Sequence, residues 1–584
     1  MPSGRGTVVC FGAPTPAGEV VIRKERNVKR WASMLAAMAL VAAACGSSSS
    51  TGPVGPKTGG TLTVALDGDM QYADPSLVSD ANSLYVANQV VEGLVGLEPG
   101  TTSVIVPVLA AALPTVSTDG LTYTFKLRSG VKFHDGTDLN AKAVQFNYDR
   151  WRNFQAGDLQ KSAFYYATVF GGFGQASNVA SMQTPDASTV VFRLSKPQSN
   201  FLITQTVVAF GIQSPAAIQA NDGNDPKLAK NAYALGTNGR GKAMVGTGPF
   251  MFAGWKAGDH VTLVRNPNYW NTSSRAYLDQ VVFRPFATPA KELSALQAGS
   301  VDLAETLVPN GVKTIRGDSG YTVFDRGMGC NLTMLGMNDL NVAGATPNAL
   351  SNQGVRQAIA AALNKASYIN GYYAGLASVA DNWVPSGTQY YTREYLPGYD
   401  ITSARGYLAL SGNSHPGPTF DLWYPTGAPE SVLPDPKGLA LSIAADLTEA
   451  GFTINVKTEA YSPNYLADAA SGKMPLFLQS QSCHWAGVDD FLYTSFFGYR
   501  NAAPPTEFNY KNDVLNALML QALSDPNPAM AKADWVSAQN MVEADMPTVP
   551  LLTSKLPAGA KKYVMGFVGA GNRTEILNTV WLNK

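Results

Sequence analysis

Charged side chains are scarce in this sequence of 584 residues. Asp, Glu, Lys and Arg together make up only 15% of it, and the 43 basic and 43 acidic residues cancel to a net charge of zero. Nucleic acids attract proteins through clustered basic side chains, and no basic stripe runs along this chain, so no nucleic-acid partner is expected. With 45% hydrophobic residues, the composition is that of a large globular protein, and the length predicts two or three domains.

Residues that carry catalytic or metal chemistry are also few. The four histidines, at positions 134, 260, 415 and 484, lack metal-ligand spacing to cysteine, aspartate or glutamate. No Gly-x-Ser-x-Gly motif marks a serine nucleophile. The sequence therefore predicts no metal, no cofactor and no catalytic residue, and we expect a protein that is not an enzyme.

Cysteine is equally rare. Of four cysteines, only Cys330 and Cys483 follow Cys45. Two cysteines in an oxidising compartment are a plausible disulfide pair, and two unrelated buried thiols are the alternative. Because the two positions lie far apart in the sequence, a bond between them would stabilise the fold by about 4–5 kcal/mol on the chain-entropy model.

The early apolar run Met34–Ala44 is too short to cross a bilayer as a helix. It follows a cluster of basic residues and fits the hydrophobic region of a secretory signal. Small residues before Cys45 resemble a bacterial lipobox, in which that cysteine receives a lipid; a signal cleaved near Ala44, with Cys45 merely nearby, is the alternative. We expect residues 1–44 to be leader and signal peptide and residues 45–58 to be a lipidated tether. The protein would then be extracytoplasmic, anchored to the bacterial cell membrane by a lipid on Cys45.

Hydrophobic periodicity in the rest of the chain indicates both strands and helices. Segments in which apolar and polar residues alternate, as in a strand, are 60–66, 121–127, 190–194, 420–424 and 452–456. Segments with helical spacing are 355–363 and 440–447, and Gly451 is well placed as a C-cap of the second. Strand, helix and strand from 420 to 456 predict a βαβ unit in a mixed or parallel sheet, so the fold class is α/β.

Several longer motifs occur in the order typical of one protein family. They are Ser117–Gly136, Gly246–Phe250, Arg265–Trp270, Leu293–Leu303 and Ala544–Leu551. Over roughly residues 59–584, the chain resembles the family 5 extracellular solute-binding proteins. These are the dipeptide- and oligopeptide-binding components of ABC importers.

The resemblance implies a periplasmic-binding-protein-like, two-lobed α/β fold of class II, with mixed sheets, a hinge between the lobes and an extra inserted subdomain. Lobe 1 would comprise residues 59–86, 243–330 and 545–584, the inserted subdomain 87–242, and lobe 2 residues 331–544. Cys330 would lie at a lobe crossing. In oligopeptide-binding relatives a cysteine here pairs with one in the block that Cys483 occupies, which favours the disulfide.

The resemblance also suggests where a ligand binds. Relatives hold the amino terminus of a peptide with an aspartate of lobe 2, because a buried ammonium requires a carboxylate partner. Alignment places Trp485 or Val488 at that position, and neither is acidic. Asp489 or Asp490 could substitute, or could belong to a solvated loop or a helix cap. Aromatic side chains could stack on sugars or fill side-chain pockets. The candidate ligand-binding residues are Asp69, Met70, Gln71, Trp383, Trp423, Gln479, His484, Trp485 and Asp489.

The sequence thus predicts a monomeric lipoprotein that captures a peptide-like ligand between two lobes. Its partners would be that ligand, the permease subunits of an ABC importer and, through the lipid, the membrane. The missing acidic residue leaves two alternatives open. One is a non-peptide solute such as a glycan, or a modified peptide; the other is an envelope lipoprotein that uses the scaffold as an interaction or regulatory partner.

Overall fold

The structure is a computed structural model that describes residues 55–237, 239–338, 349–394, 396–413, 416–499 and 507–584. The expected signal peptide and Cys45 lie outside these residues. Residues 56–584 form one compact unit. No helix within the described ranges is both long and apolar enough to cross a membrane.

The strand expected at 60–66 is β1, and it lies at the centre of a seven-stranded sheet. The order of strands is β12-β19-β11-β1-β10-β9-β8. β1 runs parallel to β10 and β11, whereas β9 is antiparallel to β10, so the sheet is mixed. Helix α8 (Pro289–Ala298) packs on β1 and on α9 (Pro309–Arg316). The strands are β1 (Thr61–Leu66), β8 (Phe250–Lys256), β9 (His260–Arg265), β10 (Gln280–Pro285), β11 (Leu303–Ala304), β12 (Tyr321–Phe324) and β19 (Ala558–Lys561).

A separate four-stranded antiparallel sheet contains the strands expected at 121–127 and 190–194. Its order is β4 (Thr115–Val116), β5 (Thr122–Lys126), β7 (Thr189–Leu194), β6 (Val179–Asp186). Helix α2 (Ala141–Arg152) covers β6 and β7. Tyr148 on this helix meets Phe192 of β7 at a ring-centroid distance of 4.7 Å, edge to face. The alternating pattern of β7 therefore buries Val190, Phe192 and Leu194 in the core of this part, as predicted.

The second half of the chain builds a six-stranded mixed sheet in the order β14-β18-β13-β17-β15-β16. β15 (Thr419–Thr426) and β16 (Thr453–Ala460) are parallel, with α13 (Pro436–Ala450) between them in the sequence, which confirms the predicted βαβ unit. Gly451 is the C-cap of α13 at φ 116°, a conformation that favours glycine. The other strands are β13 (Asn331–Met337), β14 (Ala377–Val379), β17 (Leu476–Ser482) and β18 (Val549–Ser554).

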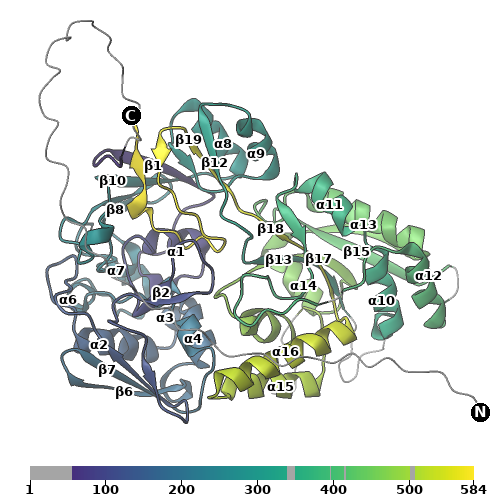
Figure 1. The fold of residues 1–584 in the computed structure, drawn as a ribbon, viewed down its shortest axis with the longest axis horizontal. Coiled ribbons are helices and arrows are strands. Elements are labelled where there is room, and N and C mark those ends of the chain that lie inside the picture. The colour runs from purple at the N-terminus through teal and green to yellow at the C-terminus, as the bar shows by residue number, and fades with distance from the viewer. Residues whose placement is uncertain (1–54, 238, 339–348, 395, 414–415, 500–506) are drawn as a thin grey trace, which may run out of the picture. The chain divides into compact units, whose positions relative to one another are not determined.

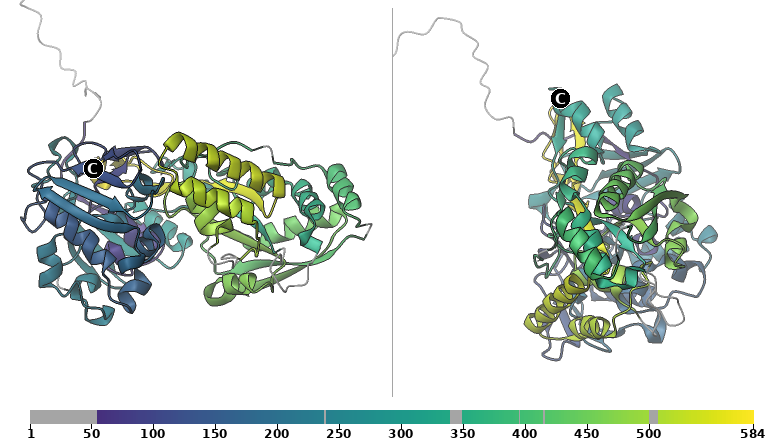
Figure 2. Two further views of the ribbon diagram at one scale, coloured as in Figure 1. Left: turned by 90° about the horizontal axis from the view of Figure 1, so that it is seen from below. Right: turned by 90° about the vertical axis from the view of Figure 1, so that its right-hand side faces the viewer.

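Helices surround this third sheet. The helix expected at 355–363 is α10 (Gln353–Ala362), which packs on α12 (Ile401–Leu410) and α13. Two long helices, α15 (Asp513–Ser524) and α16 (Pro528–Asp545), lie side by side (Figure 2). We call the part around the seven-stranded sheet lobe 1, the part around the four-stranded sheet the inserted subdomain, and the part around the six-stranded sheet lobe 2.

The chain crosses between the two large sheets twice. The first crossing joins β12 to β13, and the second joins β18 to β19, whose yellow ribbon can be followed from one sheet to the other in Figure 1. β18 pairs with β13 and β14, so it belongs to the sheet of lobe 2 although the sequence places lobe 1 from residue 545 onward. We propose that the boundary lies after Ser554.

A disulfide joins Cys330 and Cys483, which confirms the predicted pair. Cys330 directly precedes β13 and Cys483 directly follows β17, and the two Cα atoms are 5.5 Å apart. The backbone N–H of Cys483 also donates to the carbonyl of Cys330 over 2.8 Å. The bond therefore ties the first crossing to the loop that follows β17.

Candidate functional site

A cavity of about 740 Å³ lies between the two lobes and the inserted subdomain. The disulfide cysteines form part of its surface. Lobe 1 contributes the segment just after β1, the helix that follows it and residues 571–574; lobe 2 contributes residues 425, 427–433 and 478–486; the inserted subdomain contributes Tyr165 and residues 206–208. The cavity is large enough for a small organic ligand.

The lobe-2 wall is formed by the end of β17 and the loop after it. Gln479 is 6% exposed, and its Oε1 has no hydrogen-bond partner within the described part of the chain. A buried amide oxygen without a donor costs free energy, so a ligand donor at this place would be favourable. Ser480, Gln481 and Ser482 add neutral polar groups to the same wall.

Asp490 organises the loop after Cys483. Its Oδ2 accepts hydrogen bonds from the backbone N–H groups of His484 at 2.6 Å and Trp485 at 3.3 Å, and its Oδ1 pairs with Nδ1 of His484 at 2.8 Å. Burial lowers the pKa of His484, but the charge and hydrogen bond of Asp490 outweigh burial and raise it. Asp490 is 1% exposed, so its carboxylate is occupied by its own loop and does not face the cavity.

The carboxylate of Asp489 is hydrogen-bonded to two side chains. Its Oδ2 accepts from the indole Nε1 of Trp485 at 2.9 Å and from Nδ2 of Asn200, in the inserted subdomain, at 2.5 Å. Burial raises the pKa of Asp489 to about 7; the charge of Asp490 adds to the rise, and the hydrogen bonds from Asn200 and Trp485 oppose it. Trp485 itself is 4% exposed and packs in the core of the inserted subdomain. The loop thus joins lobe 2 to that subdomain.

A second contact between the inserted subdomain and lobe 2 lies at the end of α15. Ser199 donates its backbone N–H to the carbonyl of Leu523 at 2.8 Å and its hydroxyl to the carbonyl of Ala522 at 2.7 Å. Together with Trp485 and Asn200, these contacts hold the inserted subdomain to lobe 2.

The lobe-1 wall carries opposite charges side by side. Asp67, directly after β1, and Arg573, in the C-terminal segment, both line the cavity. Nε of Arg573 donates to Oε1 of Glu305 at 2.8 Å, and Nη2 contacts the other oxygen of Glu305 and Oδ1 of Asn82 at 3.3 Å. Oδ1 of Asp67 lies 3.9 Å from Nη2 of Arg573, beyond hydrogen-bond distance.

A buried ion network supports this wall. The guanidinium of Arg326, in the first crossing, pairs with Glu305 and with Glu575 and is itself fully buried. It also donates to the carbonyl oxygens of Glu305 at 2.6 Å and Leu556 at 2.8 Å. Burial raises the pKa of Glu305, but Arg573 and Arg326 outweigh burial and hold it below its ordinary value. The network connects both crossings to the C-terminal segment.

The predicted ligand-binding residues divide into two groups. Gln479, His484 and Trp485 line the cavity, and Asp489 lies behind Trp485. Asp69 instead bonds to Nε1 of Trp255 at 3.0 Å and to the backbone of Gly258 at 2.6 Å. Met70 is buried in the hydrophobic core. Gln71 is exposed and is not one of the described residues that line the cavity.

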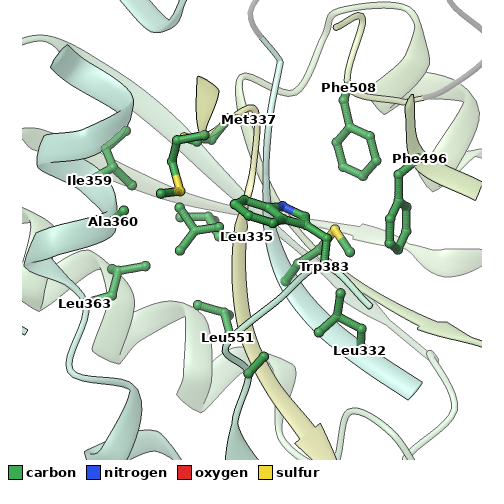
Figure 3. Packing of buried hydrophobic residues seen from close by; sticks show 14 of the residues in the cluster. Leu332, Leu335, Met337, Ile359, Ala360, Leu363, Trp383, Phe496, Phe508 and Leu551 are labelled. Atoms are coloured by element: carbon green, nitrogen blue, oxygen red, sulfur yellow. The ribbon is translucent and has the colours of Figure 1, made fainter. Parts of the chain in front are cut away.

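The two other tryptophans also lie outside the lining of the cavity. Trp383 is fully buried in the core of lobe 2, among Leu335, Met337 and Leu551, as Figure 3 shows, and its Nε1 donates to Oγ1 of Thr548 at 2.8 Å. Trp423 is partly buried on β15, with Nζ of Lys473 5.3 Å from its ring centroid.

Sequence reasoning missed Asp67, Asn82 and Arg573. Asp67 stands two residues before the predicted Asp69, at the carboxyl end of a central strand with parallel neighbours on both sides, where open α/β sheets bind ligands. The position of Asp67 after this strand could therefore have been used to predict it as a site residue. Arg573 and Asn82 are 491 positions apart and had no signal in the pattern.

The described residues of the site do not form a metal centre. Among the described residues, no three His, Cys, Asp or Glu side chains come together in a way that could hold a metal ion. What the walls offer is hydrogen bonding and charge, which suit reversible binding of a polar solute.

Comparison with known proteins agrees with this geometry. Residues 104–503 match the family described as "Bacterial extracellular solute-binding proteins, family 5 Middle", and the chain belongs to that family. The glutathione-binding protein GsiB of Escherichia coli (strain K12) is 28% identical over 526 residues, which cover 87% of this chain and 91% of GsiB.

Solved structures show the same two-lobed fold. The periplasmic binding protein DppA of Helicobacter pylori, in complex with the peptide STSA, has a TM-score of 0.70 and 27% sequence identity; the match covers 90% of this chain and 99% of DppA. The substrate-binding protein CtaP of Listeria monocytogenes has a TM-score of 0.75 at 22% identity, over 90% of this chain and all of that chain. The predicted α/β, two-lobed fold is therefore confirmed, and these relatives are binding components of transport systems.

Proposed function

We propose that this chain binds a peptide-like solute in the cavity between its lobes and delivers it to the permease of an ABC importer. The observation that carries the proposal is the cavity itself, which has walls from both lobes and a buried amide oxygen, Oε1 of Gln479, that has no donor among the residues that the structure describes. The peptide and glutathione that relatives bind support the choice of solute class.

Binding would hold the lobes together, and the closed form would dock on the permease. The solute would leave unchanged, as expected of a chain whose relatives are named as binding proteins. We therefore propose that the protein acts without catalysis, as a monomer, and on the outer side of the cell membrane. A lipid on Cys45 would anchor it there.

A thermal-shift screen tests binding. A ligand that binds only the folded protein at about 100 times its Kd stabilises it by about 2.7 kcal/mol. We expect the melting temperature to rise with some members of a set of dipeptides, tetrapeptides and glutathione. Mass spectrometry of the incubated mixtures should recover each peptide intact. If no peptide raises the melting temperature, peptide binding is wrong.

A non-peptide solute is the second candidate. One observation favours it: both carboxylates of the lobe-2 loop, Asp489 and Asp490, are occupied within the protein, so neither is free to pair with a peptide ammonium. Mass spectrometry of solutes that co-purify with the protein separates the two candidates, since it would find a glycan or a modified peptide in place of a plain one.

The anchor has its own test. We expect the wild-type chain, expressed in a bacterium, to fractionate with membranes and its N-terminal peptide to carry acyl chains. The variant Cys45→Ser should appear in the soluble extracytoplasmic fraction. An unmodified Cys45 in a membrane-free wild type would support the simple signal peptide instead.

A further inference from the structure

Hydrogen bonds hold one edge of the Arg573 guanidinium, and the other edge has no partner among the described residues. Nε and Nη2 are held by Glu305 and Asn82, whereas Nη1 makes no hydrogen bond with any residue in the described ranges. The side chain is 11% exposed and lines the cavity. An arginine presented in this way has two N–H donors directed at solvent or at a ligand carboxylate.

The backbone of Arg573 supports a functional role. Its φ is 58°, in the left-handed region that residues other than glycine adopt at an energetic cost. A hydrogen bond from its N–H to the carbonyl of Ala570, at 2.9 Å, closes the turn that holds this conformation. The strained turn places the side chain beside Asp67.

The carboxylate of Asp67 is near Arg573 but is not hydrogen-bonded to it. The two groups are 3.9 Å apart, and the buried part of the network, Arg326 and Arg573 with Glu305 and Glu575, balances in charge without Asp67. Burial, helped by the charges of Asp67 and Glu305, raises the pKa of the neighbouring Glu292 to about 9, so that carboxyl is protonated at pH 7. Asp67 is therefore the surplus anion of this wall.

The opposite wall lacks an equivalent group. Asp489 and Asp490 are bonded within the loop and to Asn200, and the exposed Glu430 is the remaining carboxylate of lobe 2 among the described residues that line the cavity. Solvent screens the charge of an exposed residue. A ligand ammonium would therefore bind most favourably on lobe 1.

We propose that Asp67 and Arg573 together bind an α-amino acid head group, in which an ammonium and a carboxylate share one carbon. The ammonium would contact Asp67, and the carboxylate would contact Nη1 of Arg573. An ordinary linear peptide carries these charges at opposite ends and cannot present both to two groups 3.9 Å apart. A γ-glutamyl compound or an amino acid with a derivatised side chain can. This inference rests on the proposed binding of solutes in the cavity and specifies their class.

Calorimetric titration with two isomers tests the inference. S-methyl glutathione has a γ-glutamyl linkage and keeps ammonium and carboxylate on one carbon, whereas the S-methylated α-linked isomer of Glu-Cys-Gly has the same atoms and net charge. Methylation prevents reaction of either thiol with the Cys330–Cys483 disulfide. We expect the γ-linked isomer to bind at least tenfold more tightly. The dipeptide Met-Leu and the tetrapeptide Ser-Thr-Ser-Ala serve as probes of peptide binding in general.

Two variants and a control assign the preference to residues. Asp67→Asn should weaken binding of the γ-linked isomer about tenfold and remove the preference; the amide has nearly the same size as the carboxylate, so the variant should fold. Arg573→Lys keeps a positive charge beside Glu305. It should also remove the preference for the γ-linked isomer, because lysine lacks the planar pair of donors. Asp69→Asn, in the same segment but bonded to Trp255 away from the cavity, should leave both affinities unchanged.

The outcomes separate this inference from the proposed function. If the linear peptides bind but the two isomers bind equally, or if Asp67→Asn keeps the preference, the head-group site is wrong and peptide binding stands. If none of the four probes binds, peptide binding fails and the head-group site with it.

Discussion

Trp485 and Asp489 are joined by a hydrogen bond of 2.9 Å from the indole Nε1 to Oδ2, and Asn200 of the inserted subdomain donates to the same oxygen. The two residues belong to one loop of lobe 2, yet the indole packs in the core of the inserted subdomain. Burial of the indole and the hydrogen bond from Asn200 therefore both stabilise the contact between lobe 2 and that subdomain. Separation of the two parts would expose the indole and break the hydrogen bond from Asn200.

The position of Trp485 leads to a prediction about the lobe equilibrium. Trp485→Ala removes an anchor that spans two parts, whereas Trp383→Ala removes one that lies wholly inside lobe 2. Both should lower the free energy of unfolding by about 3–5 kcal/mol. Only Trp485→Ala should raise the radius of gyration of the folded protein in small-angle X-ray scattering. An equal radius in the two variants would contradict a spanning role.

A pH dependence follows from Asp489. Its pKa is about 7 in the fold and about 3.9 in an unfolded chain, so the fold favours the protonated form. The stability that the protonated group contributes is present below pH 4 and is lost as the pH rises through 7. Over that range the wild type should lose at most about 4 kcal/mol relative to Asp489→Asn, whose single amide oxygen can accept both existing hydrogen bonds.

Urea unfolding at pH 4, 6 and 8 measures this difference. Since other carboxylates titrate over the same range, the informative quantity is the gap between Asp489→Asn and the wild type at each pH. Asp318→Asn is the control for an aspartate that is exposed, with a carboxylate that accepts from the backbone N–H of Gly320. A gap for Asp489→Asn that does not change with pH would show that Asp489 keeps an ordinary pKa.

The disulfide should be a large contributor to stability. It closes a loop between positions 153 apart in sequence, which on the chain-entropy model corresponds to about 5 kcal/mol. Reduction should therefore lower the urea midpoint of the wild type strongly. The double variant Cys330→Ala/Cys483→Ala should start at the lower midpoint and show no response to reductant.

Arg326 should be the most sensitive charged residue. Its replacement by leucine leaves Glu305 and Glu575 buried with one compensating charge fewer, which costs about 3–5 kcal/mol. The loss should shrink as the pH falls, because protonation of the two carboxyls removes the uncompensated charge. Arg405→Leu is the control, since Arg405 is exposed and bonds only to the carbonyl of Glu449; its effect should stay within about 0.5 kcal/mol. Equal losses in the two variants at pH 7 would contradict the importance of the buried network.

Local sequence patterns predicted the elements well. Alternation in β1, β5 and β15 and helical spacing in α13 depend only on which face of each element is buried, and that is written in consecutive residues. The disulfide was predictable because few cysteines were available. The same patterns could not tell Trp383 from Trp485, since a core tryptophan and a cavity tryptophan have the same local signature.

The site was less predictable because tertiary contacts decide it. Asp67 and Asp69 both follow β1, and only the path of the chain after the strand turns one toward the cavity and the other toward Trp255. The partners of Arg573 come from Asn82 and Glu305, which are distant in sequence. A single sequence contains no periodic signal for such pairs.

The strand order has a consequence for biogenesis. β18 lies between β13 and β14, and β19 lies between β11 and β12. Neither large sheet can therefore be completed before an interior strand from beyond residue 548 is available. A polypeptide that emerges amino-terminus first, from a ribosome or a translocation channel, cannot finish either sheet until nearly all of it is outside. The topology thereby delays completion of both large sheets until the last part of the chain is available, whereas the four-stranded sheet, whose strands all lie within residues 115–194, can form earlier.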